Sequence, residues 1–189
     1  DDGRIVYEQD LIVSRLQQDP PRHVTGSVYD FVAEGISEQA EYLKRYHEIS
    51  HLVMTDPSDK NLNELARLQE QLDNLGLWQL DSRINEVIEQ LGLDANVQLA
   101  SLSGGWLRKA ALGRALVSGP RVLLLDEITS ALDESNKQNV NEIIHGYATE
   151  KQVAVLWVTH DRNEISHADE VITLQPAGGN MQEVQHERA

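Results

Sequence analysis

The sequence predicts an α/β protein with an inserted α-helical hairpin. Two runs, 122–125 and 153–158, are strongly apolar and of strand length, as expected of parallel strands that are covered on both faces. Helical patterns over 106–117 and 136–148 accompany these strands, and such alternation is typical of α/β domains. Residues 37–76, in contrast, show only helical periodicity.

Composition narrows the class of protein. With 189 residues, 40% of them apolar and 25% charged, the chain can build a core. Its 16 Lys and Arg against 31 Asp and Glu give a net charge of −15, which disfavours a nucleic-acid grip over the whole surface but leaves room for a local basic patch. The absence of Cys excludes disulfides, thiolate metal sites and a Cys nucleophile. No apolar run approaches the roughly 20 residues of a membrane span, so we expect no membrane insertion and a cytoplasmic location.

The N-terminal part combines short strands with a capped helix. Residues 5–7 and 11–16 are predicted strands, and the second ends before Pro20, which cannot donate to a sheet. Thr25 or Ser27 is expected to cap a helix over 28–32.

The hairpin follows from two amphipathic runs. Apolar residues at three- and four-residue spacings predict helices on either side of a break at 56–58, and the second run stops at Gly76. Each apolar face is too narrow for an independent core, so the hairpin should pack on the body or on a partner. A further helix is expected over 82–91, closed by Gly92.

These patterns divide the chain into two parts. Residues 1–22 and 93–189 are assigned to an α/β core, whose last strand is expected at 171–174. Residues 23–92 are assigned to a helical subdomain, with the arm-like hairpin at 37–76.

A first candidate site lies at the start of the helix over 106–117. Ser103, Gly104 and Gly105 precede Trp106, and glycines there let backbone N–H groups approach an anion closely. Ser103 can cap the helix or donate to a phosphate oxygen. Taken alone, an ordinary Ser-Gly-Gly turn explains this segment equally well.

A second candidate is the acidic pair Asp126-Glu127, which closes the strand 122–125. The carboxyl ends of strands in α/β sheets line the ligand crevice. Asp126 could there hold Mg²⁺ and Glu127 could orient an attacking water. The alternative, acids that merely end a strand, is common.

His160 and Gln18 are weaker candidates. His160 follows the strand 153–158 and could hydrogen-bond a γ-phosphate, although a polar strand end is the commoner reason for such a residue. Gln18, with Gln17 as an alternative, follows the strand 11–16 and carries almost no signal by itself.

The order of these features resembles an ATP-binding cassette (ABC) ATPase. Residues 102–106 resemble the signature motif with Trp106 in place of the usual Gln, 122–127 the Walker B strand with its catalytic Glu, and 130–133 the D-loop. His160 resembles the switch His and Gln18 the Q-loop Gln. This resemblance implies ATP and Mg²⁺ as cofactors.

The resemblance also implies a role for each residue. Glu127 and His160 would be catalytic, and Asp126 and Gln18 would serve the metal. Gln18 and Asp133 would also contact nucleotide, while Ser103, Gly104 and Gly105 would contact the nucleotide of a second cassette.

The class can be narrowed by the insertion. Ser103 lies 85 positions after Gln18, more than a transporter cassette needs, and the surplus is the hairpin at 37–76. Residues 1–127 resemble the first cassette of the ABC-F class, whose members act on ribosomes. Residues 128–189 resemble a transporter-type subunit of an iron exporter. We therefore hypothesise a fusion of two cassette lineages at 123–127.

The sequence contains no Gly-x-x-x-x-Gly-Lys-Ser/Thr, so the P-loop that cradles phosphates in ABC ATPases is missing. We expect this portion to lie just upstream of Asp1. The predicted fold is thus a P-loop NTPase-like cassette without its N-terminal P-loop portion.

Three functions stay open at this point. An ABC-F cassette would partner a second cassette, in cis or as a dimer, and the ribosome or its RNA. A transporter subunit would partner a membrane permease, and a non-catalytic module would only dock through its hairpin. The basic residues of 44–47 could touch RNA, but a solvated helix face is the commoner reason for such a cluster.

Overall fold

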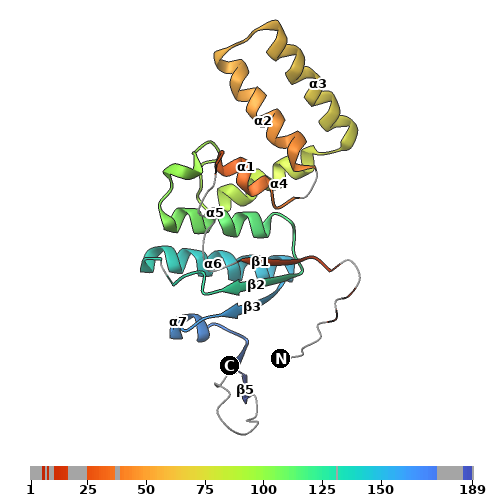
Figure 1. Ribbon diagram of the computed structural model, residues 1–189. Coiled ribbons are helices and arrows are strands. Elements are labelled where there is room, and N and C mark those ends of the chain that lie inside the picture. The colour runs from red at the N-terminus through yellow and green to blue at the C-terminus, as the bar shows by residue number, and fades with distance from the viewer. Residues whose placement is uncertain are drawn as a thin grey trace.

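A three-stranded parallel sheet lies at the centre of the α/β part (Figure 1). Its strands are β1 (Val13–Leu16), β2 (Val122–Asp126) and β3 (Ala154–Val158), in the order β1-β2-β3. Val122 of β2 lies opposite Val13 on one side and Ala154 on the other. The computed structural model describes residues 6, 8, 11–16, 25–36, 39–130 and 132–173, and the backbone of 185–188.

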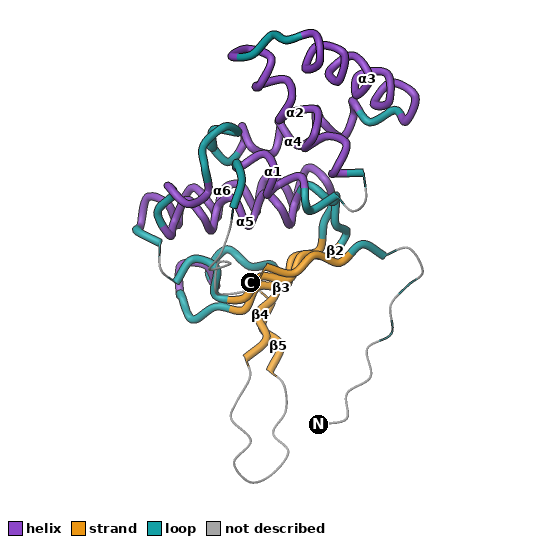
Figure 2. Tube along the Cα trace, turned by 45° about the horizontal axis from the view of Figure 1, so that its top comes forward, coloured by secondary structure: helices purple, strands orange, loops and turns teal. Residues whose placement is uncertain are grey.

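One face of this sheet is buried under helices. Side chains alternate along a strand, and Leu16, Leu123 and Leu125 all point to the same covered face. Helices α5 (Gly104–Leu116) and α6 (Glu134–Lys151) belong to this core, and both lie on the same side of the sheet in Figures 1 and 2.

The opposite face of the sheet is exposed, contrary to the prediction that 153–158 is a buried strand. Leu156 is 56% and Val158 49% exposed, and Ala154 is exposed as well. Within the described part of the chain, no helix packs on this face (Figure 1). One face of the apolar strand β3 therefore packs on the core of this chain, and its other apolar face is exposed.

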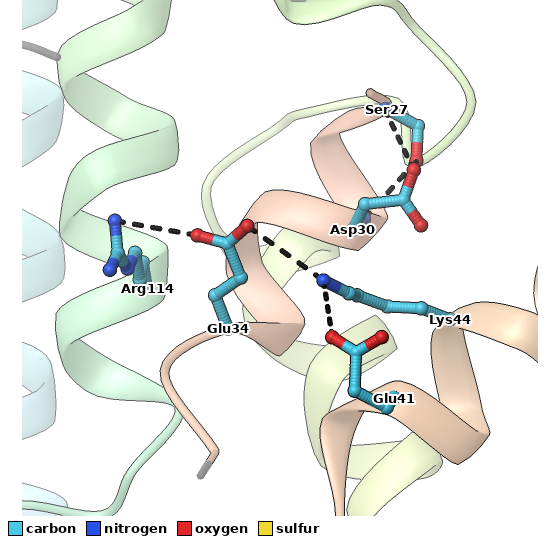
Figure 3. Close-up of polar contacts among 6 residues, drawn as sticks. All are labelled: Ser27, Asp30, Glu34, Glu41, Lys44 and Arg114. Carbon is cyan, nitrogen blue, oxygen red and sulfur yellow. Dashed lines mark hydrogen bonds and ion pairs between the residues drawn. The ribbon is translucent and has the colours of Figure 1, made fainter. Parts of the chain in front are cut away.

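Helices α1 (Val28–Ala33) and α4 (Trp78–Gln90) pack on the side of α5 that faces away from the sheet. Ser27 caps α1 as one of the two predicted residues: its hydroxyl accepts from Asp30 N–H at 3.1 Å, and its own N–H donates to the Asp30 carboxylate (Figure 3). Gly35, just after α1, lies so close to α5 that an added Cβ would stand 2.0 Å from the Arg114 carbonyl oxygen.

The predicted helical hairpin is present as α2 (Ala40–Thr55) and α3 (Asp59–Leu75), which project away from the sheet (Figures 1 and 2). Its break includes Asp56, whose carbonyl accepts from Asn61 Nδ2 at 2.9 Å. Gly76 ends α3 in the left-handed conformation, with φ of 65°.

The base of the hairpin packs on the body through aromatic contacts. Tyr46 meets Trp78 of α4 edge-on at 5.2 Å, and His47 stacks on Tyr29 of α1 at 4.0 Å. Burial lowers the pKa of His47, and the neighbouring His51 lowers it further. The base therefore presents its rings to α1 and α4 as a packing surface.

Ion pairs also occupy the basic residues of this base (Figure 3). Lys44 lies 2.9 Å from Glu41 and 3.8 Å from Glu34, which in turn lies 3.5 Å from Arg114 of α5. Arg45 pairs with Glu48 at 2.7 Å. Lys44 and Arg45 are thus paired with acids of this chain, and a role of the cluster in contacting RNA stays a hypothesis.

Shorter elements complete the described structure. The 3₁₀ turn Leu99–Ser101 precedes α5, α7 (Arg162–Ile165) follows β3, and β4 (Glu170–Thr173) pairs antiparallel with β5 (Gln185–Arg188). The strand predicted at 11–16 is confirmed as β1, whereas 5–7 lie almost wholly outside the described residues. The division into core and helical subdomain stays a prediction. Among the described helices, none combines the length and apolarity that a bilayer crossing requires.

Candidate functional site

The carboxyl ends of β2 and β3 bring three predicted site residues together. Asp126 ends β2 opposite Val158, the last residue of β3. The Glu127 N–H donates to the Val158 carbonyl at 2.9 Å, and His160 Nε2 lies 3.2 Å from Glu127 Oε1. Adjacent parallel strands thus place an acid pair and an imidazole at one edge of the sheet.

Glu127 has an unusual backbone. Its φ of 46° lies in the left-handed region, which costs a non-glycine residue roughly 1–2 kcal/mol. The chain reverses there, and the Ser130 N–H donates to the Glu127 carbonyl at 3.2 Å. The Glu127 side chain is 27% exposed while His160 is 89% exposed, so the carboxylate is partly buried and the imidazole is open to solvent.

Asp126 is accessible and faces a cation. Its Oδ2 lies 3.8 Å from Arg15 Nη2 on β1, and its side chain is 41% exposed. A carboxylate is a ligand type that Mg²⁺ prefers, and Mg²⁺ commonly takes only one or two from the protein, with phosphates and waters as the rest. The described residues contain no group of three or more His, Asp or Glu arranged for a metal. The fit of Asp126 to Mg²⁺ rests on its accessible carboxylate.

The glycine-rich segment forms the start of α5, as predicted. Ser103 is the N-cap residue, but its side chain makes no capping hydrogen bond. An added Cβ on Gly104 would meet nothing within 4 Å, whereas one on Gly105 would lie 3.2 Å from Leu132 Cδ2. The backbone at Gly104 is therefore open to close approach, and the segment after Glu127 packs beside Gly105.

The first turns of α5 carry a buried cation. Lys109 is buried, its ammonium lies 4.6 Å from the centroid of the Trp106 ring, and burial lowers its pKa. The nearby Asp133 opposes that shift. Trp106 thus covers a lysine that lies near Asp133.

Asp133 acts in the structure as the N-cap of α6. Its Oδ1 accepts from Asn136 N–H at 2.9 Å and its Oδ2 from Asn136 Nδ2 at 2.7 Å. These hydrogen bonds lower the Asp133 pKa. Residues 127–130 and 132–133 therefore lie between the acid–imidazole group and the start of α5, with Leu132 beside Gly105.

Gln18, with its alternative Gln17, lies outside the described residues. The strand before it does reach this edge of the sheet, because Leu16 of β1 lies opposite Leu125, one residue before Asp126.

The sequence reasoning missed a buried acid behind this site. Glu164 of α7 accepts hydrogen bonds from the hydroxyls of Thr129 and Thr159. Thr159 directly precedes His160, so its place near the candidate site can be predicted from the sequence. Thr129 is 35 residues from Glu164, and no local sequence pattern predicts the hydrogen bond between them.

Together, a parallel sheet, an acid pair after one strand, an imidazole after the next and a glycine-opened helix define an ATP-binding cassette. A family model described as "ABC transporter" matches residues 22–130, more than half of the chain. The chain belongs to this family.

The curated relatives that the chain is similar to include cassettes of ABC-F type. The chain is 68% identical over 165 residues to the ATP-binding protein Uup of Escherichia coli K12, an alignment that covers 87% of this chain and 25% of Uup. It is 36% identical over 161 residues to the "Energy-dependent translational throttle protein EttA" of Mycobacterium tuberculosis H37Rv, covering 85% of this chain and 28% of EttA. The chain thus spans about a quarter of the length of these relatives. The predicted ABC-F-like cassette is confirmed.

Transporter cassettes are also similar. The chain is 52% identical over 121 residues to the "Probable iron export ATP-binding protein FetA" of Escherichia coli K12, covering 59% of this chain and 54% of FetA. The structure of cbiO1 from Clostridium perfringens, part of the ABC transporter complex cbiONQ, superposes with a TM-score of 0.55 at 21% identity, covering 85% of this chain and 52% of cbiO1. This likeness confirms the α/β cassette fold.

The alignment with Uup is longer than 127 residues, so the likeness to Uup continues past Glu127. The likeness to Uup therefore extends across the segment 123–127. The fusion at that segment stays a hypothesis.

Proposed function

We propose that this cassette supplies one half of an ATP-hydrolysing site and also contributes to the site of a second cassette. The observation that carries the proposal is the 3.2 Å contact between His160 Nε2 and Glu127 Oε1 at the ends of two parallel strands, next to Asp126. An acid pair beside an imidazole at a strand-end crevice suits phosphoryl chemistry, in which positioning and charge stabilisation dominate.

Glu127 is the proposed base or water-positioning residue. Its carboxylate is partly buried beside His160, where it can accept a hydrogen bond from an attacking water. His160, at the exposed rim, can donate to a γ-phosphate oxygen and hold the Glu127 carboxylate in place. Asp126 would hold Mg²⁺, which supplies charge neutralisation on the phosphates. Gln18, which follows β1 in the sequence, would act on the metal and water.

The opposite role falls to the start of α5. Ser103, Gly104 and Gly105 would contact the ATP of a second cassette, in cis or as a dimer, because the Gly104 backbone is open and a helix N-terminus favours anions. Asp133 would assist from the D-loop beside them.

We further propose that the 189-residue chain alone binds ATP weakly and hydrolyses none. Its sequence lacks the P-loop motif, and each charge-assisted phosphate contact contributes about 1.5–3 kcal/mol. Calorimetry should therefore give no dissociation constant below about 100 µM, and tighter binding would contradict this part of the proposal.

The catalytic assignment is tested in a version of the chain preceded by a P-loop segment. Glu127→Gln should abolish ATP turnover and leave ATP bound in a closed dimer, because the amide keeps the shape of the carboxylate but cannot act as a base. Glu150→Gln, an exposed change on α6, is the matched control. Unchanged turnover in Glu127→Gln would remove Glu127 from its role, and no turnover in the extended chain itself would favour a non-catalytic docking module.

For the intact protein we propose an ABC-F role on ribosomes in the cytoplasm. The hairpin α2–α3 supports it, as does the relative whose name links it to translation. Residues 40–75 carry four Lys and Arg against seven Asp and Glu, so the hairpin is more suited to docking by shape and apolar contact than by phosphate attraction.

The second candidate, a transporter subunit bound to a membrane permease, is favoured by the 52% identity to FetA. Co-sedimentation with ribosomes against co-purification with a permease separates the two. Ribosome binding that survives deletion of residues 40–75 would contradict the role of the hairpin.

A further inference from the structure

Glu164 is a buried acid that no part of the proposed reaction uses. It lies on the short helix α7, with only 7% of its surface exposed. The Thr129 hydroxyl donates to its Oε1 and the Thr159 hydroxyl donates to its Oε2. Both oxygens of one carboxylate are thus engaged by hydroxyls from two different segments.

These two segments carry the proposed catalytic pair. Thr129 stands two residues after Glu127, in the turn where the Leu132 N–H donates to the Thr129 carbonyl at 2.9 Å. Thr159 stands directly before His160. Glu164 is therefore the shared partner of the chain on which the acid sits and the chain on which the imidazole sits.

The network extends to α6 on the His160 side. The Thr159 hydroxyl oxygen accepts from the Asp161 N–H at 3.0 Å, and Asp161 Oδ2 lies 3.0 Å from Lys137 Nζ. This ion pair lowers the Asp161 pKa. The segment of His160 is thus fixed on one side to α6 and on the other, through Glu164, to the turn after Glu127.

We infer that Glu164 is a positioning residue that sets the distance between Glu127 and His160 by holding Thr129 and Thr159 on its two carboxylate oxygens. The inference rests on the proposed function of that pair. A carboxylate suits this task because it offers two acceptors in one plane to two donors, while an amide offers one acceptor and one donor group. Buried hydrogen bonds to a charged group are stronger than neutral ones and are costly to lose.

The first test measures amide hydrogen exchange by NMR in the 189-residue chain itself. Thr129→Val removes one donor to Glu164 and changes no residue of the His160 segment. If Glu164 couples the segments, exchange at the Asp161 amide should still accelerate about tenfold, the change that about 1.4 kcal/mol of lost local stability produces. The Val117 amide, which donates to Gly113 inside the core, should not change and so reports that the fold is intact.

Three further variants complete the cycle. Glu164→Gln should accelerate exchange at both Leu132 and Asp161, and Thr129→Val added to it should produce no further increase at Asp161. Thr129→Ser keeps the hydroxyl and should restore the exchange rates of the unmodified chain. Glu89→Gln, an exposed change on α4, is the matched control. If Thr129→Val leaves Asp161 exchange within about twofold of the unmodified chain, the two segments are independent and the inference is wrong.

The second test reads out catalysis in the P-loop-extended version. Glu164→Gln should lower kcat about tenfold with KM for ATP nearly unchanged, because the pair is displaced while nucleotide contacts persist. An equal kcat in this variant would overturn the positioning role. Failure of the proposed function has a different signature, since Glu127→Gln would then keep its turnover while the exchange coupling through Glu164 could still be present.

Discussion

Glu127 shows how function and stability conflict at a single residue. Its carboxylate is needed beside His160, yet its backbone adopts a left-handed conformation that favours glycine. The hydrogen bonds of its N–H to Val158 and of its carbonyl to Ser130 hold this conformation in place. Strain of this kind persists where the surrounding structure overrides it, and at this position it aims the side chain toward the next strand.

This strain can be measured with two matched substitutions. Glu127 and Gln152 both have a left-handed backbone, with φ of 46° and 54°. Glu127→Gly and Gln152→Gly should each relieve the backbone strain and raise the free energy of unfolding by about 0.5–1 kcal/mol. Gln152 only caps α6, so its change should leave turnover of the P-loop-extended version intact, whereas Glu127→Gly should abolish it. Urea denaturation gives the stabilities. A loss of stability in Glu127→Gly would show that its side-chain contacts outweigh the backbone strain.

At this scale the sequence predicted which residues lie together in the candidate site better than the hydrogen bonds that support them. Asp126, Glu127 and His160 were found because each follows an apolar strand, and adjacent parallel strands end at one edge. The bond from Thr129 to Glu164 had no such signal, because it joins residues 35 positions apart and depends on packing alone. For Asp133 the sequence suggested a nucleotide contact, and the structure adds a helix-capping role.

Among the elements, α5 connects the site to the hairpin. Its start carries Ser103 and Gly104, one side packs on the sheet, and the other side packs on α1 and α4. Gly113 of α5 lies close to Leu91 and Val32, and Gly35 lies against the Arg114 carbonyl. Small residues at these contacts bring the backbones of α1 and α5 together, so the base of the hairpin, which packs on α1, is joined to α5 through α1.

The close contact at Gly35 predicts a steric effect. In Gly35→Ala the new methyl would meet the Arg114 carbonyl oxygen at 2.0 Å and Val117 Cγ1 at 2.6 Å, so α1 must move and the protein should lose about 1–3 kcal/mol. Gly146→Ala is the matched control, because nothing lies within 4 Å of its added methyl in the interior of α6, and it should stabilise by about 0.5–1 kcal/mol. Thermal unfolding compares the two. Equal stability of both variants would mean that α1 is not held against α5 in solution.

The helix boundaries were predicted best where the sequence carries a capping residue or a helix-ending residue. The capped helix α1 and the hairpin, with its break at Asp56 and its stop at Gly76, lie close to the predicted positions. Helix α4 begins at Trp78, four residues before the predicted start at Ser82. The sequence did not indicate this start because the N-cap residue, Leu77, makes no side-chain capping hydrogen bond. Its first turn is instead fixed by tertiary contact, since Trp78 packs on Tyr46.

At the scale of the whole molecule, the net charge opposes association between copies of the chain, whereas the exposed face of the sheet promotes it. A net charge of −15 favours solubility through repulsion between copies. The exposed face of the sheet, with Leu156 and Val158, is an apolar surface of the kind that promotes association. The parallel sheet was predictable from its apolar runs, but which face is covered was not, because both faces of β3 have apolar side chains.

The exposed sheet face predicts dye binding and its removal. The unmodified chain should enhance the fluorescence of 8-anilinonaphthalene-1-sulfonate, and Leu156→Thr should reduce that signal while changing the free energy of unfolding by no more than about 0.5 kcal/mol, because Leu156 is 56% exposed and Thr suits a strand. Leu125→Thr, on the covered face where Leu125 is 1% exposed, should instead cost about 2–5 kcal/mol. Urea denaturation checks both stabilities. Dye binding that is unaffected by Leu156→Thr would place the apolar surface elsewhere, and a large loss of stability in that variant would mean that this face of β3 is covered in solution.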